Sequence, residues 1–252
     1  MTIRLHIDRT LVEHDEFPLP EGAARHAQVR RVQPGDELHL FDGRGHEHAA
    51  QVLEMGRKAV VVRLGPACAA LAELPQPVTL ALGMPANERM DTLVEKATEL
   101  GVHAIQPLEC ERSVLRLSGE RALRKREHWQ AVAVAASEQC GRAWVPQVEP
   151  VRSLTQWLQG LDGLEAPQDV GAALGRWLLS FGAQALPPGA WLRKMKTPPA
   201  DLQVLSGPEG GLSPAEEEAA RAAGFCAVTL GPRVLRADTA PLALLAWWGL
   251  RE

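Results

Sequence analysis

Residues 207–211, Gly-Pro-Glu-Gly-Gly, place three glycines in one short turn. Glycine has no Cβ, so a backbone of this composition can approach a ligand closely. Ser213, Pro214 and Glu216 then match an N-cap, a first helical residue and a capping-box partner. We therefore expect the turn to join a buried strand to a helix and to form one wall of a site for a nucleotide-like ligand.

A second turn of the same kind follows about twenty residues later. Residues 227–230 are predicted to form a short strand, and Gly231 opens the segment Gly-Pro-Arg-Val-Leu-Arg that ends at Arg236. A helix is expected soon after it. Two glycine-containing loops close together in the chain predict two walls of a single site.

These loops need a scaffold, and the sequence from residue 78 onward predicts alternating strands and helices. Met90, Leu93, Val94 and Ala97 fall at helical spacing, and Gly101 stands where a helix-ending glycine belongs. We expect strands at 78–82, 104–108, 177–180 and 202–205, and helices at 90–100, 121–140 and 239–250. This alternation predicts a mostly parallel α/β sheet, and ligands bind such sheets outside the carboxyl ends of the strands.

The first ~70 residues show a different pattern. Polar and apolar residues alternate over 37–41, Asp42 and Gly43 favour a hairpin turn, and strands are expected at 48–53 and 58–64. Short strands with tight turns predict a small β-barrel. A proline-containing linker over 66–77 separates the two predicted domains, 1–70 and 77–252.

The composition is typical of a globular protein. The chain has 252 residues, of which 46% are hydrophobic and 23% charged. Apolar runs stay below the roughly 18 residues of a membrane span, and the N-terminus lacks the apolar core of a signal peptide. We expect a cytoplasmic location and no membrane partner. The cysteines are scattered without a CxxC pair, which favours reduced thiols and no metal over a catalytic thiol or a metal site: Cys68, Cys110, Cys140 and Cys226.

Basic residues are clustered although the formal net charge is −4. Arg25, His26, Arg30 and Arg31 form one cluster, and residues 112–126 hold six basic side chains against one acid. Such patches attract phosphate groups even on a mildly acidic protein. The alternative for each patch alone is an ordinary solvated helix face.

The common nucleotide-binding and hydrolase motifs are absent from the sequence. It contains no GxxxxGK[ST] loop, no GxGxxG after the first α/β strand and no GxSxG elbow. P-loop ATPases, Rossmann dinucleotide enzymes and α/β-hydrolases are therefore disfavoured. The turn at 207–211 is not specific by itself, and its interpretation depends on the sequence blocks that accompany it.

Those blocks occur in a specific order and spacing. They are Gly-Met-Pro at 83–85 and residues 90–102, 111–114, 138–142, 206–213, 230–236 and 238–240, with His26, Val29, Arg31, Pro-Gly-Asp at 34–36 and Phe-Asp-Gly at 41–43. With this set, the chain resembles the RsmE family of 16S rRNA uridine-N3 methyltransferases, which are SPOUT methyltransferases. The resemblance covers nearly the whole chain.

The resemblance implies a fold and partners that the pattern alone does not. They are an α/β fold with a SPOUT-type parallel sheet and a C-terminal trefoil knot, preceded by a small PUA-like β-barrel. Chains generally avoid knots, so this expectation rests on the resemblance alone. The same resemblance implies a homodimer that uses S-adenosyl-L-methionine to methylate N3 of a uridine in the decoding region of 16S rRNA, in the small ribosomal subunit.

The resemblance also assigns cofactor-binding residues to three loops. The glycines would let the adenosine come close to the backbone, and the leucines would supply apolar walls. The alternative for each leucine is simple packing in the core. The expected cofactor-binding residues are Leu179, Ser180, Gly207, Pro208, Gly210, Gly211, Leu230, Gly231 and Leu235.

Methylation at N3 requires loss of the N3 proton, whose pKa lies well above neutrality. Each unit of pKa mismatch costs about 1.4 kcal/mol. The site can supply a base, for which Glu209 and Asp238 are candidates, or a cation that stabilises the anion forming on O2 or O4, for which Arg233 and Arg236 are candidates. Asp238 also fits a helix start, and Arg236 also fits a loop-ordering salt bridge.

RNA contacts are expected from Arg25, Arg30, Arg31 and Arg112. Contacts of this kind with phosphates position the target without selecting the base. The chain departs from the family where Ala237-Asp238 replaces the usual Thr-Glu, where Ser206 replaces an apolar residue, and at Arg30, where leucine is common. Two alternatives stay open: a SPOUT enzyme with another RNA target, and a non-catalytic RNA-binding assembly factor.

Overall fold

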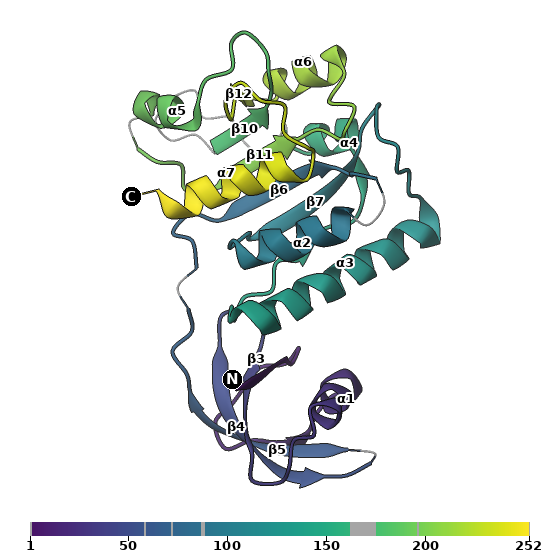
Figure 1. The fold of residues 1–252 in the computed structure, drawn as a ribbon, viewed down its shortest axis with the longest axis vertical. Coiled ribbons are helices and arrows are strands. Elements are labelled where there is room, and N and C mark those ends of the chain that lie inside the picture. Colours follow the sequence, from purple (N-terminus) through teal and green to yellow (C-terminus); the bar gives the residue numbers. More distant parts are fainter. Residues whose placement is uncertain are drawn as a thin grey trace. The chain divides into compact units, whose positions relative to one another are not determined.

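The computed structural model describes residues 2–57, 59–71, 73–86, 89–161, 175–195 and 197–251. The chain divides into two compact units (Figure 1). The first holds Met1–Glu73 and Val134–Val145, and the second holds Leu74–Ala133 and Pro146–Glu252. The expected α/β organisation, a β unit followed by a parallel-sheet unit, is confirmed, while the predicted domain limits at 70 and 77 stay a prediction.

The first unit is built on a five-stranded mixed sheet. Its strands are β1 (Ile3–His6), β2 (Glu16–Pro18), β3 (Glu37–Phe41), β4 (Glu47–Met55) and β5 (Val60–Ala67), in the order β1-β3-β4-β5-β2. β1 runs parallel to β3, and the other neighbours are antiparallel. The hairpin predicted around Asp42 and Gly43 joins β3 to β4. Alternating side chains such as Leu38, Leu40 and Val62 form the core of this unit.

Helix α1 (Glu21–Val29) of the first unit was not expected from the sequence. Its buried side chains are Ala24 and Ala27, which give a weak hydrophobic pattern, and its N-cap, Pro20, makes no side-chain cap. The helix ends in a Schellman motif, because Arg31 donates to Gln28 and Val32 donates to Ala27. Arg31 occupies the left-handed position of this motif, with φ of 57°.

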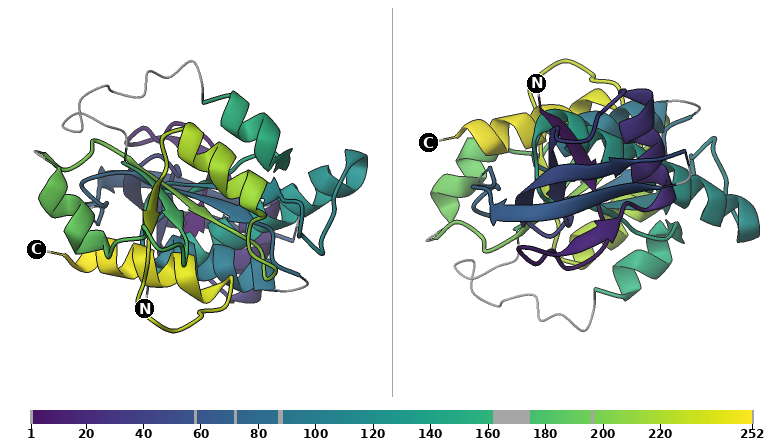
Figure 2. Two further views of the ribbon diagram at one scale, coloured as in Figure 1. Left: turned by 90° about the horizontal axis from the view of Figure 1, so that it is seen from above. Right: turned by 90° about the horizontal axis from the view of Figure 1, so that it is seen from below.

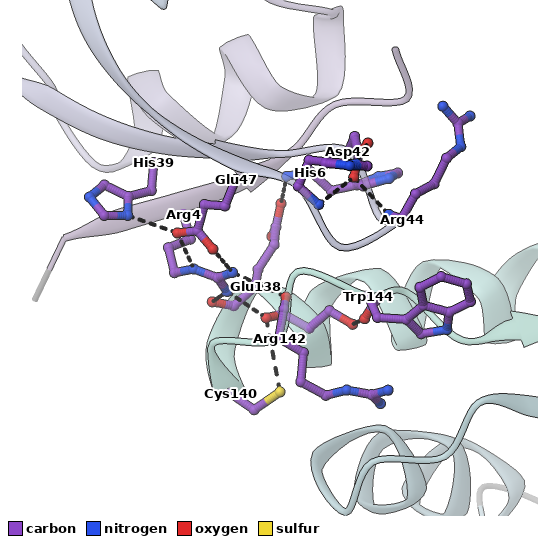
Figure 3. Close-up of polar contacts among 12 residues, drawn as sticks. Arg4, His6, His39, Asp42, Arg44, Glu47, Glu138, Cys140, Arg142 and Trp144 are labelled. Atoms are coloured by element: carbon purple, nitrogen blue, oxygen red, sulfur yellow. Dashed lines mark hydrogen bonds and ion pairs between the residues drawn. The ribbon is translucent and has the colours of Figure 1, made fainter. Parts of the chain in front are cut away.

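The last turns of α3 (Gly119–Cys140) belong to the first unit, where Arg4 binds carbonyl groups at and just after the end of the helix (Figure 3). The Arg4 guanidinium donates to the carbonyl of Ser137 at 2.8 Å and to that of Arg142 at 3.1 Å. It also forms an ion pair with Glu47 at 2.7 Å. Burial alone would raise the pKa of Glu47, but hydrogen bonds from Arg4 and His39 lower it. A cation at a helix C-terminus stabilises the helix dipole.

Asp42 organises the β3–β4 turn in the same unit (Figure 3). Its carboxylate is almost fully buried and accepts hydrogen bonds from the backbone N–H of Arg44 at 2.7 Å and of His46 at 3.1 Å. Burial acts to raise the pKa of Asp42, yet these bonds and the nearby His46 imidazole lower it. The turn therefore depends on an ionised carboxylate.

The second unit contains a parallel sheet with helices on both faces (Figure 2). Its strands lie in the order β12-β10-β11-β6-β7-β8, and β9 also pairs with β7. The strands are β6 (Val78–Gly83), β7 (Ala104–Glu109), β8 (Gln147–Val148), β9 (Arg152–Ser153), β10 (Gly175–Leu179), β11 (Leu202–Ser206) and β12 (Cys226–Val228). The remaining helices are α2 (Arg89–Glu99), α4 (Leu154–Gln159), α5 (Pro188–Lys194), α6 (Pro214–Ala222) and α7 (Thr239–Leu250).

Alternate residues of the strands pack against different helices. Leu178 and Leu205 share a core with Trp157 of α4 and Ala220 of α6. Trp177, the neighbour of Leu178, points the other way and meets Trp248 of α7 edge-on, with ring centroids 5.2 Å apart. Both faces of the sheet are thus covered, which explains why its strands are mostly apolar.

Candidate functional site

A cavity of about 600 Å³ opens at the carboxyl ends of three adjacent strands of the second unit, β12, β10 and β11. Three loops form its walls: the turn after β10, the glycine-rich loop after β11 and the loop between β12 and α7. This is where ligands bind in open α/β sheets. The cavity is lined by Arg89, Leu179, Ser180, Phe181, Gly182, Ser206, Gly207, Pro208, Glu209, Gly210, Gly211, Leu212, Glu217, Val228, Leu230, Arg233, Val234, Leu235, Arg236, Ala237 and Ala240.

The glycine-rich loop lies directly against the end of β6, which neighbours β11 in the sheet. A Cβ at Gly83 would stand 2.5 Å from Cδ of Pro208 and 2.9 Å from the carbonyl carbon of Gly207. A Cβ at Gly207 would stand 2.9 Å from the backbone nitrogen of Leu212. Only glycine fits at either place, so the loop is closed tightly beneath the cavity.

The helix start predicted after this loop is confirmed. Ser213 accepts a hydrogen bond from the backbone N–H of Glu216, and the Glu216 carboxylate accepts one from the N–H of Ser213 at 2.8 Å. The same carboxylate also accepts from the N–H of Glu111 at 2.7 Å. The capping box therefore joins the glycine-rich loop to the segment that follows β7.

Glu209 connects the same loop to the segment after β6. Its carboxylate accepts a hydrogen bond from the N–H of Ala86 at 2.9 Å and forms an ion pair with Arg89 at 3.2 Å. The Glu209 side chain is about a quarter exposed, at 28%. The carboxylate that the sequence suggested as a base thus holds two loops together.

Arg112, an expected RNA contact, also binds this loop. Its guanidinium donates to the carbonyl of Gly210 at 3.2 Å and to that of Leu212 at 3.3 Å. A Cβ at Gly210 would lie 3.0 Å from the Arg112 Cβ. The side chain therefore packs on the back of the glycine-rich loop while its surface remains exposed.

The turn after β10 is fixed by a chain of hydrogen bonds. Ser180 is buried, and its hydroxyl accepts from the N–H of Gly182 at 3.0 Å and donates to the Glu217 carboxylate at 3.3 Å. Arg221 in turn holds Glu217 at 2.6 Å. Phe181 lies at the apex of this turn and is 63% exposed.

The loop between β12 and α7 presents two arginines to the cavity. Arg233 and Arg236 are exposed, and neither guanidinium makes a hydrogen bond or an ion pair with the residues that the structure describes. The Arg236 carbonyl accepts from the N–H groups of Thr239 and Ala240, both at 3.0 Å, which starts α7. The main chain is therefore anchored while both cationic groups stay available.

The cavity brings together most of the residues expected from the sequence. All the predicted cofactor-binding residues except Gly231 line it, as do Arg233, Arg236 and Glu209. Gly231 and Asp238 do not. Asp238 occupies the N-cap position of α7 but makes no side-chain cap. Gly231 has a positive φ of 106°. Both residues therefore belong to the backbone of the loop and not to the cavity wall.

The remaining expected residues lie elsewhere, and sequence reasoning missed several residues of the wall. Arg25, Arg30 and Arg31 lie on and just after α1 in the first unit. Phe181, Val234, Glu217 and Arg89 line the cavity but were not expected there. Val234 follows Arg233 directly, so its position in the loop was the available signal. Among the described residues, His, Cys, Asp and Glu side chains form no group that could hold a metal ion.

Comparison with known proteins places the chain in a family. Residues 72–249 match the model of an RNA methyltransferase domain, and residues 19–65 match that of an RNA methyltransferase PUA domain. The ribosomal RNA small subunit methyltransferase E of Bacillus subtilis is 32% identical over 223 residues, which are 86% of this chain and 83% of that protein. The chain belongs to the RsmE family. It combines a PUA unit with a SPOUT-type methyltransferase unit.

Other known proteins resemble the chain in sequence and structure. The Synechocystis enzyme of the same name is 35% identical over 219 residues, covering 87% of this chain and 67% of that protein. The crystal structure of the Neisseria gonorrhoeae enzyme bound to S-adenosyl methionine matches with a TM-score of 0.86 and 34% identity, over 98% of this chain and 96% of that one. A Legionella pneumophila methyltransferase in complex with the same cofactor matches with a TM-score of 0.85 and 29% identity, over 98% and 97%.

None of the helices in the described part of the chain is both long and apolar enough to cross a membrane.

Proposed function

We propose that the chain is an S-adenosyl-L-methionine-dependent methyltransferase that modifies N3 of a uridine in the decoding region of 16S rRNA. The observation that carries this proposal is the cavity at the ends of β10, β11 and β12, which combines a glycine-rich wall with two arginines that have no partner among the described residues. Membership of the RsmE family supplies the reaction class. The cofactor complexes of the two bacterial relatives support the choice of methyl donor.

The residues of the cavity fit this donor. Gly207, Gly210 and Gly211 line the cavity and carry no side chains of their own, so the backbone of the loop can approach an adenosine closely. Leu179, Leu230 and Leu235 provide apolar surface for the purine ring. The bound cofactor supplies an electrophilic methyl group, and the chain's own residues orient it and bring the acceptor to it. Ser180 and Pro208 complete the expected wall.

The contacts of the chain favour charge stabilisation over a base. Arg233 and Arg236 line the cavity with free guanidiniums, which can stabilise the negative charge that forms on the uracil oxygens when N3–H is lost. Glu209 is engaged by Ala86 and Arg89, and Asp238 lies outside the cavity wall. Arg236 and Arg233 therefore carry the proposed catalytic role, while Glu209 and Asp238 shape the loops.

RNA binding is proposed for the first unit and for Arg112. Arg25, Arg30 and Arg31 lie on one short stretch around the end of α1, and α1 falls within the part matched to the PUA domain. On the basis of the family resemblance, we also propose domains at 1–70 and 77–252, a C-terminal trefoil knot and a homodimer. A substrate in the small ribosomal subunit implies that the enzyme works in the cytoplasm.

The test uses the full chain with labelled donor and small ribosomal subunits from cells that lack this modification. Mass spectrometry of nuclease digests identifies the product. We expect 3-methyluridine at one position, and a strongly reduced rate for Arg236→Met with less loss for Arg236→Lys, which keeps the charge. A different methylated nucleoside would refute the uridine-N3 assignment. Donor binding by calorimetry without transfer to any rRNA would instead identify a non-catalytic assembly factor.

A further inference from the structure

Phe181 is unusual among the aromatic side chains of the described residues. It is the only Phe or Trp among the exposed large hydrophobic residues, at 63% exposure, whereas Phe17, Phe41 and Phe225 are buried. Of the described residues that line the cavity, it is also the only Phe or Trp. An aromatic ring left in solvent at the mouth of a ligand site gains free energy when a flat ligand covers it.

The backbone that carries Phe181 is ordered in advance. The bond from the N–H of Gly182 to the Ser180 hydroxyl closes a turn around Phe181, and Glu217 and Arg221 hold that hydroxyl from α6. Binding of a ligand to the ring therefore requires little further ordering of the loop. Pre-organisation of this kind increases affinity by reducing the entropy lost on binding.

The chemistry of the acceptor indicates what the ring contacts. N3 of uracil lies on the Watson–Crick edge, so the base must leave any stack or pair before its N3 can be methylated. Enzymes that expose a base in this way hold it by stacking on aromatic or apolar side chains. Phe181 lines the same cavity as Arg233 and Arg236, whose guanidiniums suit the uracil oxygens.

From this combination we infer that Phe181 stacks on the target uracil and holds it beside Arg233 and Arg236. The inference rests on the proposed function, since it requires a uridine acceptor. The adenine of the donor is the less suitable occupant, because the glycine loops and the leucines already form a more enclosed apolar wall. Leu179, the last residue of β10, is only partly exposed, in contrast to Phe181.

Steady-state kinetics on small subunits separate these roles, with Phe181→Leu as the main variant and Phe181→Tyr as the conservative one. Leucine keeps apolar volume but loses the aromatic face. We expect Phe181→Leu to raise KM for the subunit roughly 5- to 100-fold, the range of a lost base stack, and Phe181→Tyr to restore it. The Kd for S-adenosyl-L-methionine by calorimetry should change less than about twofold.

Salt dependence adds a readout that a structural role would not produce. Stacking releases no counterions, so the slope of log KM against log salt should be the same for Phe181→Leu and wild type, whereas Arg31→Ala should flatten it. Thermal unfolding and light scattering give the stability and the oligomeric state of each variant.

Four outcomes overturn the inference. They are an unchanged KM for the subunit, a rise in the Kd of the donor, a failure of Tyr to rescue, and a change of oligomeric state that accounts for the loss. Failure of the proposed function would give a different result, because the wild-type protein itself would then yield no 3-methyluridine. If wild type is active and Phe181→Leu behaves as wild type, the stacking inference alone is wrong.

Discussion

The carboxylate of Glu209 accepts a hydrogen bond from the backbone N–H of Ala86 at 2.9 Å. Ala86 lies in the segment after β6, and Glu209 lies in the loop after the neighbouring strand β11. Arg89, at the start of α2, reinforces the link at 3.2 Å. Two loops that are more than a hundred residues apart in sequence are thus fastened together at the edge of the residues that line the cavity. Glu209 acts on the shape of the site, and its role can be separated from that of a base.

Replacing Glu209 by Gln and by Ala distinguishes these roles. Gln still offers an oxygen to the Ala86 N–H, so Glu209→Gln should cost little donor affinity, whereas Glu209→Ala removes both links and should lower it by roughly tenfold, or about 1.4 kcal/mol. Calorimetry with S-adenosyl-L-methionine measures both. A general base would give another result: both variants would lose kcat alike, with donor affinity retained and the pH profile flattened.

Gly83→Ala tests the tight closure of the glycine-rich loop. The new Cβ would stand 2.5 Å from Pro208 and 2.6 Å from its backbone nitrogen, so the loop must move away from β6. We expect a stability loss of ~1–3 kcal/mol, as for an overpacked core, together with weaker donor binding. Gly22→Ala is the matched control, because a Cβ there meets nothing within 4 Å. Unchanged donor affinity in Gly83→Ala would mean that the loop does not shape the cofactor site.

Local sequence signals predicted the longer strands and helices of the second unit but missed β8, β9, α4 and α5. Contacts between residues far apart in the sequence could not be predicted in this way. The capping box of Ser213 and Glu216 was predictable because both partners lie within one helical turn. The contact between Gly83 and Pro208 follows from the pairing of β6 with β11, which no local pattern encodes. Helix α1 escaped prediction because alanines form its buried face.

The candidate site shows the same division. The glycines of a strand–helix turn predicted one wall of the cavity, and the sequence of the second loop indicated Arg233 and Arg236. Phe181 was not, because its position depends on the hydrogen bonds of Ser180 with Gly182 and Glu217. Asp238 does not line the cavity although its neighbours Arg236 and Ala237 do, because a loop changes direction within a few residues.

Arg31 offers a test that separates stability from RNA binding. It occupies a left-handed conformation, φ 57°, at the end of α1, where glycine is the usual residue. Arg31→Gly should therefore stabilise the protein by up to about 1 kcal/mol, the strain relief being partly offset by the greater freedom of glycine in the unfolded chain. Its RNA affinity should fall, with a salt slope reduced by about one.

Arg31→Ala is the control for that experiment. It keeps the left-handed strain but removes the guanidinium, so it should lose RNA affinity as Arg31→Gly does without the gain in stability. Denaturant unfolding and filter binding at several salt concentrations measure the two effects. Full RNA affinity in either variant would return Arg31 to the role of a solvated surface residue.

The ion pair of Arg4 and Glu47 gives the first unit a defined dependence on pH. The folded-state pKa of Glu47, like that of Asp42, lies below its ordinary value, so the unfolded chain binds more protons in the acid range. The stabilisation that these carboxylates contribute is complete above the ordinary carboxyl pKa, near 4, and is lost as the pH falls through the lowered pKa values.

Glu47→Gln leaves Arg4 without its buried counter-charge and should cost about 3 kcal/mol at pH 7, with a smaller difference from wild type at pH 3. Glu54→Gln, an exposed change on the same strand, should follow wild type at every pH. Urea unfolding between pH 3 and 7 measures all three, and a constant gap between wild type and Glu47→Gln across that range would contradict the assigned role.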